Sequence, residues 1–171
     1  MTFGFEHFFI FLQISIICLF LSQCGFLLKK IIFLESDNKN FEENGLFGFI
    51  FIGLISLTVN FFYPLNLIIN NTIFIIIFFV SFMLNFFNQN KIKLIKKILC
   101  VSFFCYILFI YANVNNPDAL LYHLPYSKII NDEKIIIGLA NIHFRFGHIS
   151  IFQYISSFFN NSLFKENGVL I

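Results

Sequence analysis

The stretch GLFGFIFIGLISLTVNFFYPLNLIINNTIFIIIFFVSFMLNFFNQN, residues 45–90, contains no charged residue. A helix needs about 20 mostly apolar residues to cross the hydrocarbon core of a bilayer. The stretch is too long for one such helix and long enough for two. Pro64 and the asparagines that follow it interrupt the apolar pattern near the middle. We therefore expect two membrane-spanning helices here, at residues 46–63 and 72–87.

The composition of the whole chain supports a membrane protein. Of its 171 residues, 58% are hydrophobic and 12% are charged. A soluble domain normally carries about 25% charged residues. The chain is therefore predicted to be an all-α integral membrane protein with membrane lipid as a partner. Its net charge of +2 gives no reason to expect nucleic acid as a partner.

Two further apolar segments flank the charge-free stretch. Residues 8–28 contain no charged side chain, and residues 98–113 follow the lysine-rich segment KIKLIKK. We expect each segment to form a spanning helix. Residues 1–113 are thus predicted to be a four-helix transmembrane region.

The remainder of the chain is more polar. Residues 114–146 cannot span a membrane and are expected to form an extracytoplasmic loop with short helices at the interface. Residues 147–164 contain no Lys, Arg, Asp or Glu and are a candidate fifth transmembrane helix. Residues 165–171 add no closing element, and we expect a truncated tail of an N-terminal fragment. The predicted total is four to five transmembrane helices.

The lysines indicate the orientation of the helices. The loop after the first predicted helix holds three lysines and the loop after the third holds four. The N-terminus and the loop between the second and third helices hold neither Lys nor Arg. Short loops rich in Lys and Arg stay in the cytoplasm. We therefore place the N-terminus outside, although Lys128, Lys134 and Arg145 in the loop after the fourth helix oppose this weakly.

The sequence NNPDALLYHLP, residues 115–125, has the pattern of a helix start. Asn116 is a good N-cap, and the proline after it suits the first helical position. Asp118 falls in the first turn, where the helix dipole favours an ionised carboxylate. Pro125 is expected to break or kink this helix.

Two interpretations of this stretch remain open. In the first, Asp118 serves the helix cap, Tyr122 anchors at the lipid headgroups and His123 is solvated. In the second, Asp118 is a catalytic carboxylate at the mouth of a membrane cavity. It would then act as a general base on an acceptor hydroxyl or hold a divalent cation.

A second polar segment, GLANIHFRFGHIS, covers residues 138–150 and contains Arg145, the only arginine. The planar guanidinium matches the oxygens of a lipid phosphate. The alternative is an interfacial arginine whose charged end reaches for water. His123, His143 and His148 do not have metal-ligand spacing such as HExxH, so no zinc site is predicted on these histidines.

Together, PDALLYHLPYSKII and GLANIHFRFGHISIFQYISSFF resemble a segment of bacterial multi-spanning proteins related to the GT-C glycosyltransferases. These include the dolichyl-phosphate-mannose mannosyltransferase-like and aminoarabinose-transferase-like families. Members often carry an Asp followed shortly by Tyr-His-Leu-Pro in an early extracytoplasmic loop. One branch adds a GLxNxHxRFG string before the next span, which here covers residues 138–147. The resemblance extends over residues 117–159.

The resemblance implies sugar transfer from a polyprenyl-phosphate donor on the outer face of the bacterial inner membrane. It implies that Asp118 is the catalytic acidic residue, and we assign substrate binding to Tyr122, His123, His143 and Arg145. A divalent cation stays open as a cofactor. The chain departs from the families in two ways: four predicted helices precede the motif, and a single acid replaces the double acid of many members.

A different class of function is also consistent with the chain, namely a non-catalytic multi-pass protein of polysaccharide assembly or transport. Transporters usually carry ionisable residues inside their spans. The four predicted helices contain no charged residue, which counts against an ion-coupled transporter. Gln13, Gln23 and Asn60 leave room for this alternative.

Overall fold

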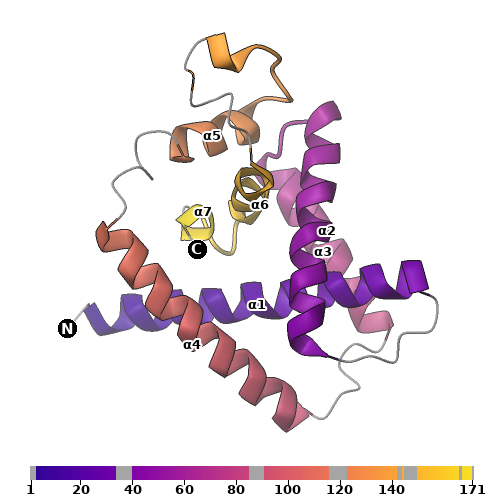
Figure 1. Cartoon of the computed structure of the whole chain (residues 1–171), viewed down its shortest axis with the longest axis vertical. Coiled ribbons are helices and arrows are strands. Elements are labelled where there is room, and N and C mark those ends of the chain that lie inside the picture. Colours follow the sequence, from indigo (N-terminus) through magenta and orange to yellow (C-terminus); the bar gives the residue numbers. More distant parts are fainter. Residues whose placement is uncertain are drawn as a thin grey trace. The chain divides into compact units, whose positions relative to one another are not determined.

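The computed structural model describes residues 3–33, 40–84, 91–115, 123–141, 144, 150–165 and 167–170. Over these residues the secondary structure is entirely helical, without a strand (Figure 1). An all-helical fold is what an apolar chain adopts in a bilayer, because each helix satisfies its backbone hydrogen bonds internally. The predicted all-α class is confirmed.

Four apolar helices come first in the chain: α1 (Phe3–Phe33), α2 (Phe41–Phe62), α3 (Leu67–Met83) and α4 (Lys91–Asn115). Three of them contain segments long and apolar enough to cross a membrane, namely Glu6–Ile32, Phe41–Phe62 and Ile92–Tyr111. The 17 residues of α3 extend for about 26 Å at 1.5 Å per residue, somewhat less than a hydrocarbon core of about 30 Å.

Helix α3 begins five residues earlier than the predicted residue 72, at Leu67. The backbone N–H of Ile69 donates to Asn66 Oδ1 at 3.0 Å, which satisfies a donor that the helix leaves open at its start. Asn66 therefore begins the helix. Asn70 and Asn71, expected in the break after Pro64, lie inside α3.

The polar region after α4 contains short helices. These are α5 (Leu124–Asp132), the 3-10 helix η2 (Leu139–Asn141), α6 (Ile151–Phe159) and α7 (Asn167–Leu170). The candidate fifth transmembrane helix, residues 147–164, contains α6, which has nine residues. A helix of that size is about 13 Å long and cannot cross a bilayer. The chain turns after Phe159, where Asn161 Oδ1 accepts from the backbone N–H groups of Leu163 and Phe164.

The chain divides into two compact units. Unit 1 comprises Met1–Ile52 and Ile73–Ile110, and unit 2 comprises Gly53–Thr72 and Tyr111–Ile171. Unit 1 therefore contains α1 and most of α3 and α4, whereas unit 2 contains the α2–α3 corner and the short helices.

In unit 1, α1 and α2 cross at two glycines. A Cβ atom on Gly25 would overlap the backbone carbonyl of Asn44, and one on Gly48 would overlap that of Leu21. Such close approach of two backbones is the usual way in which membrane helices associate. Elsewhere in unit 1, the rings of Phe20 and Phe74 stack with their centroids 4.2 Å apart.

Two ion pairs in unit 1 join helix ends. Lys29 near the end of α1 pairs with Glu43 in the first turn of α2, at 2.9 Å. Lys97 in α4 pairs with Glu42 at 2.9 Å. These pairs bring the end of α1 and the starts of α2 and α4 together, as expected for helices that alternate in direction.

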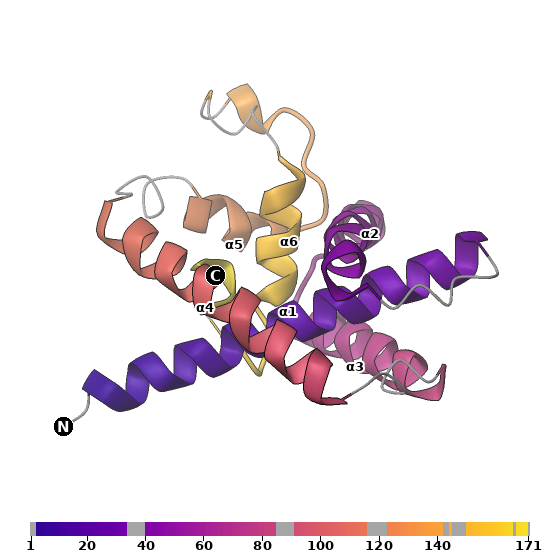
Figure 2. The ribbon, with the colours of Figure 1, turned by 60° about the horizontal axis from the view of Figure 1, so that its bottom comes forward.

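In unit 2, the core consists of Leu65 from the α2–α3 corner, Tyr126 and Ile130 from α5, Leu139 from η2 and Tyr154 from α6. Helices α5 and α6 lie side by side (Figure 2). The burial of these apolar side chains holds α5 and α6 against the corner, since each buried side chain contributes about 1.5–3 kcal/mol relative to exposure.

Candidate functional site

Helix α5 begins at Leu124, within the last two residues of the first polar string, residues 115–125. Pro125 stands in its first turn and His123 at the position before the helix, where its side chain is exposed. A proline is accommodated there because a first-turn N–H needs no partner within the helix. Pro125 thus stands in the first turn of α5, and the predicted helix start at Asn116–Asp118 lies outside the described residues.

Helix α6 starts directly after the second polar string. Its first turn is a capping box: the backbone N–H of Ser150 donates to Gln153 Oε1 at 3.1 Å, and the N–H of Phe152 donates to Ser150 Oγ at 3.3 Å. This arrangement satisfies N–H groups that a helix start otherwise leaves open. The capping box therefore fixes Ser150, the last residue of the second polar string, at the start of α6.

Asn60 links the last turn of α2 to the end of α5. Its side chain is buried, and Nδ2 donates to the carbonyl oxygens of Ile130 at 3.1 Å and Glu133 at 3.0 Å. Its own backbone carbonyl accepts from the N–H of Ile135 at 3.0 Å. Asn60 thereby adds a second donor to the Ile130 carbonyl, which also accepts from the N–H of Leu65 at 3.0 Å, and supplies a donor to the Glu133 carbonyl just after α5.

Three more asparagines join α3, α5 and α6. Asn70 Nδ2 donates to the carbonyls of Leu65 at 2.9 Å and Ser157 at 2.9 Å. Asn131 Nδ2 donates to the same two carbonyls at 2.6 Å and 2.9 Å. Asn160 Nδ2 donates to Asn131 Oδ1 at 2.9 Å. We call Asn60, Asn70, Asn131 and Asn160 the asparagine cluster.

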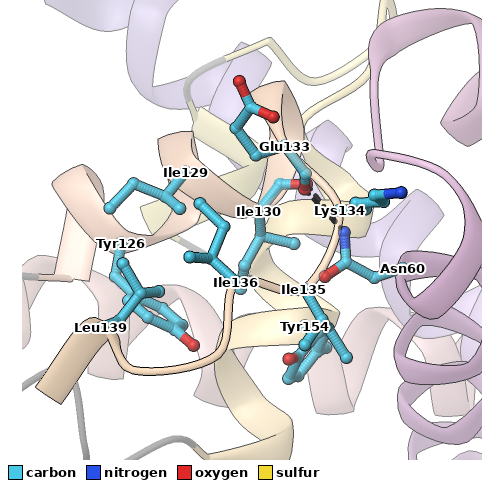
Figure 3. Close-up of a pocket in the computed structure, with 10 residues that line it drawn as sticks. All are labelled: Asn60, Tyr126, Ile129, Ile130, Glu133, Lys134, Ile135, Ile136, Leu139 and Tyr154. Atoms are coloured by element: carbon cyan, nitrogen blue, oxygen red, sulfur yellow. Dashed lines mark hydrogen bonds between the residues drawn. The ribbon is translucent and has the colours of Figure 1, made fainter.

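A small cavity lies next to Asn60 in unit 2 (Figure 3). Its volume is about 20 Å³, enough for one water molecule and far below the roughly 300–1,000 Å³ of a small-molecule site. Tyr126 and Tyr154 line it. Burial raises the pKa of both phenols, and their proximity raises that of Tyr126 further. The two tyrosines therefore stay neutral. The cavity is too small to hold a sugar donor.

Of the predicted site residues, the structure describes His123. The others, Asp118, Tyr122, His143 and Arg145, lie outside the described residues. Among the described residues, no three His, Cys, Asp or Glu side chains gather closely enough to hold a metal ion.

What the structure adds is the support between the two polar strings. The first string runs into the first turn of α5, and the second ends where α6 begins. The asparagine cluster bonds these helices to each other and to the α2–α3 corner. Sequence reasoning missed these asparagines as a group. One feature of the sequence could have indicated the cluster. Its asparagines lie at the ends of apolar segments, and an amide side chain that a bilayer deprives of water needs a partner within the protein.

Comparison with known proteins covers nearly the whole chain. A family profile, described as Domain of unknown function (DUF8201), matches residues 8–170. The chain belongs to the DUF8201 family. No curated protein and no solved structure matches it.

The DUF8201 match includes the apolar helices as well as both polar strings, since residues 8–170 extend from α1 into α7. The family match therefore extends well beyond residues 117–159. In this DUF8201 protein, units 1 and 2 both lie almost entirely within the matched residues.

Proposed function

We propose that the chain is a GT-C-like glycosyltransferase, or part of one, that transfers a sugar from a polyprenyl-phosphate donor outside the cytoplasm. The supporting observation is the pair of strings PDALLYHLP and GLANIHFRFG. The first runs into the first turn of α5 and the second lies shortly before α6, and these two helices are joined by the asparagine cluster. Polar chain segments mounted on a rigid scaffold are the usual carriers of catalytic residues.

The chemistry assigns distinct tasks to two residues. Asp118 accepts the proton of the acceptor hydroxyl while that oxygen forms a bond to the anomeric carbon of the donor sugar. The bond from this carbon to the phosphate oxygen breaks, and the polyprenyl phosphate leaves with the electron pair. Arg145 stabilises the negative charge of the departing phosphate through its guanidinium.

The test is a comparison of Asp118→Asn with Asp132→Asn. An asparagine in place of Asp118 keeps the size and the capping capacity of the carboxylate but cannot accept the proton. Removing a general base costs roughly 10²–10⁴-fold in rate. Asp132 is a matched control because it is an exposed acid at the end of α5, and its replacement should leave the rate unchanged.

The assay uses membranes that contain the full-length gene product, supplied with radiolabelled polyprenyl-phosphate hexoses and pentoses. Label in the acceptor fraction is compared between variants at equal protein abundance. If Asp118→Asn transfers at the wild-type rate, Asp118 is a capping residue. The protein is then better regarded as a non-catalytic component of polysaccharide assembly or transport.

A further inference from the structure

The turn between α5 and η2 carries unusually exposed apolar side chains. Ile137 is 96% exposed and Ile136 is 42% exposed. Single exposed apolar residues are common on proteins. Ile137 is almost fully accessible, whereas Ile136 exposes part of its side chain and also lines the cavity next to Asn60 (Figure 3).

The turn is held on both sides by the core of unit 2. Before it, the N–H of Ile135 donates to the carbonyl of Asn60 at 3.0 Å. After it, Gly138 adopts φ +92°, a conformation that favours glycine, and Leu139 is buried against Tyr126 and Tyr154. The exposure of Ile137 is therefore a property of an anchored turn with defined backbone contacts.

The base of the turn lies level with the end of a predicted membrane span. Asn60 is two residues from Phe62, where α2 ends, a separation of about 3 Å along the helix axis. Figure 3 shows Ile135 and Glu133 next to Asn60. At this end of α2, Phe61, Phe62 and Tyr63 are each at least 60% exposed. Tyrosine, like tryptophan, is enriched at the membrane–water interface, and Tyr63 fits this role at the end of α2.

We propose that residues 135–138 form an interfacial anchor, in which Ile137 and the exposed part of Ile136 insert among the lipid headgroups and upper acyl chains of the bilayer that α2 crosses. The occupant of this surface is lipid because the turn is bonded to the end of a membrane-spanning helix. Lys134, exposed beside the turn, is placed to meet lipid phosphates. The anchor does not depend on the proposed sugar transfer.

The chain contains no tryptophan, so one introduced tryptophan is a unique fluorescent reporter. The reporter is Ile137→Trp in the full chain, reconstituted in vesicles of phosphatidylcholine and phosphatidylglycerol. Lipids brominated near the carbonyl or near the chain end quench a tryptophan according to its depth. Leu54→Trp, exposed in the middle of α2, marks the depth of the membrane interior, and Asp132→Trp marks the polar surface of α5.

The anchor predicts a blue-shifted emission for Ile137→Trp and stronger quenching by the shallow bromine than by the deep bromine. Leu54→Trp should show the reverse order, and Asp132→Trp should be quenched least by either lipid. Emission at the wavelength of water-exposed tryptophan, with full quenching by acrylamide, would overturn the anchor.

Protection of the reporter from both acrylamide and bromine would also overturn the anchor, because it would show that protein covers the turn. Ile137 is too exposed for its replacement to disturb the core. Ile136→Trp supplies a second reporter on the same turn should the first variant not accumulate.

Discussion

Asn70 of α3 and Asn131 of α5 donate to the same two backbone carbonyls, those of Leu65 and Ser157. Each amide therefore bonds at once to the α2–α3 corner and to α6. Both side chains are buried, so an acceptor that lost these donors could not turn to water instead. The two asparagines act as one connection between three segments that are distant in sequence.

The shared acceptors predict coupling between Asn70 and Asn131. Asn70→Ala and Asn131→Ala should each lower the free energy of unfolding by about 1–3 kcal/mol. Neighbours in one hydrogen-bond network couple by about 0.5–3 kcal/mol, so the double variant should depart from the sum of the single variants by an amount in that range. Denaturant titration in detergent micelles measures each value.

The control for this cycle is Asn141→Ala, an exposed asparagine of η2 in the same unit. Surface replacements usually change stability by less than about 0.5 kcal/mol. Strict additivity of Asn70→Ala and Asn131→Ala would contradict a shared connection.

The crossing of α1 and α2 predicts a sharp difference between two glycines. Gly25→Ala places a methyl group against the backbone of Asn44, whereas Gly45→Ala meets no atom within 4 Å. Overpacking should cost Gly25→Ala about 1–3 kcal/mol. Gly45→Ala should gain up to about 1 kcal/mol from better helix propensity. Thermal unfolding in the same detergent compares the two, and equal stabilities would show that the helices cross elsewhere.

The bonds made by Asn60 predict local opening at the end of α5. Asn60→Ala removes the side-chain donor to the carbonyls of Ile130 and Glu133. The Ile130 carbonyl keeps the N–H of Leu65, and the loss should cost about 1–3 kcal/mol. If opening precedes cleavage, trypsin should cut after Lys134 roughly 5- to 150-fold faster. Thr58→Val is the control, because Thr58 is in the same helix and bonds only to its own preceding turn among the hydrogen bonds described. Unchanged cleavage after Lys134 would mean that Asn60 does not secure this segment.

The distribution of lysines predicts which loops face the cytoplasm. A cysteine at Asn40, between α1 and α2, should resist an impermeant thiol reagent in intact cells, while one at Asp132 should react. Asp132 is the appropriate outer position because it is exposed, whereas its neighbour Asn131 is 8% exposed. Labelling in cells and in lysed membranes is compared by gel shift, with the unmodified chain as the control for its four native cysteines. The opposite pattern would reverse the orientation.

The proposed phosphate contact predicts that Arg145→Lys weakens donor binding. Lysine keeps the charge but loses the paired N–H groups that match two phosphate oxygens. Binding of a polyprenyl phosphate, measured by displacement of a fluorescent analogue, should fall by about tenfold for each 1.4 kcal/mol lost. Lys128→Arg, which adds a guanidinium on the exposed face of α5, should leave binding unchanged. Equal affinity of Arg145→Lys and the wild type would make Arg145 a simple interfacial cation.

The apolar helices could be predicted from the composition and the local pattern of the sequence. The charge-free stretch at residues 45–90 predicted two helices with a break near Pro64, and α2 and α3 meet at that corner. This inference works because a bilayer requires a long apolar segment whose backbone is satisfied within the helix. Those conditions depend only on neighbours in sequence.

The short helices and their connections required partners from distant parts of the chain. Asn70 looked like part of a loop but lies inside α3, where its side chain bonds to the backbone of Ser157, 87 positions away. Residues 147–164 looked like a span, yet the helix stops at Phe159 because Asn160 and Asn161 take part in hydrogen bonds that turn the chain. An asparagine can cap, turn or cross-link, and its local sequence is compatible with all three. The fold selects one by supplying the carbonyl or amide that the side chain meets.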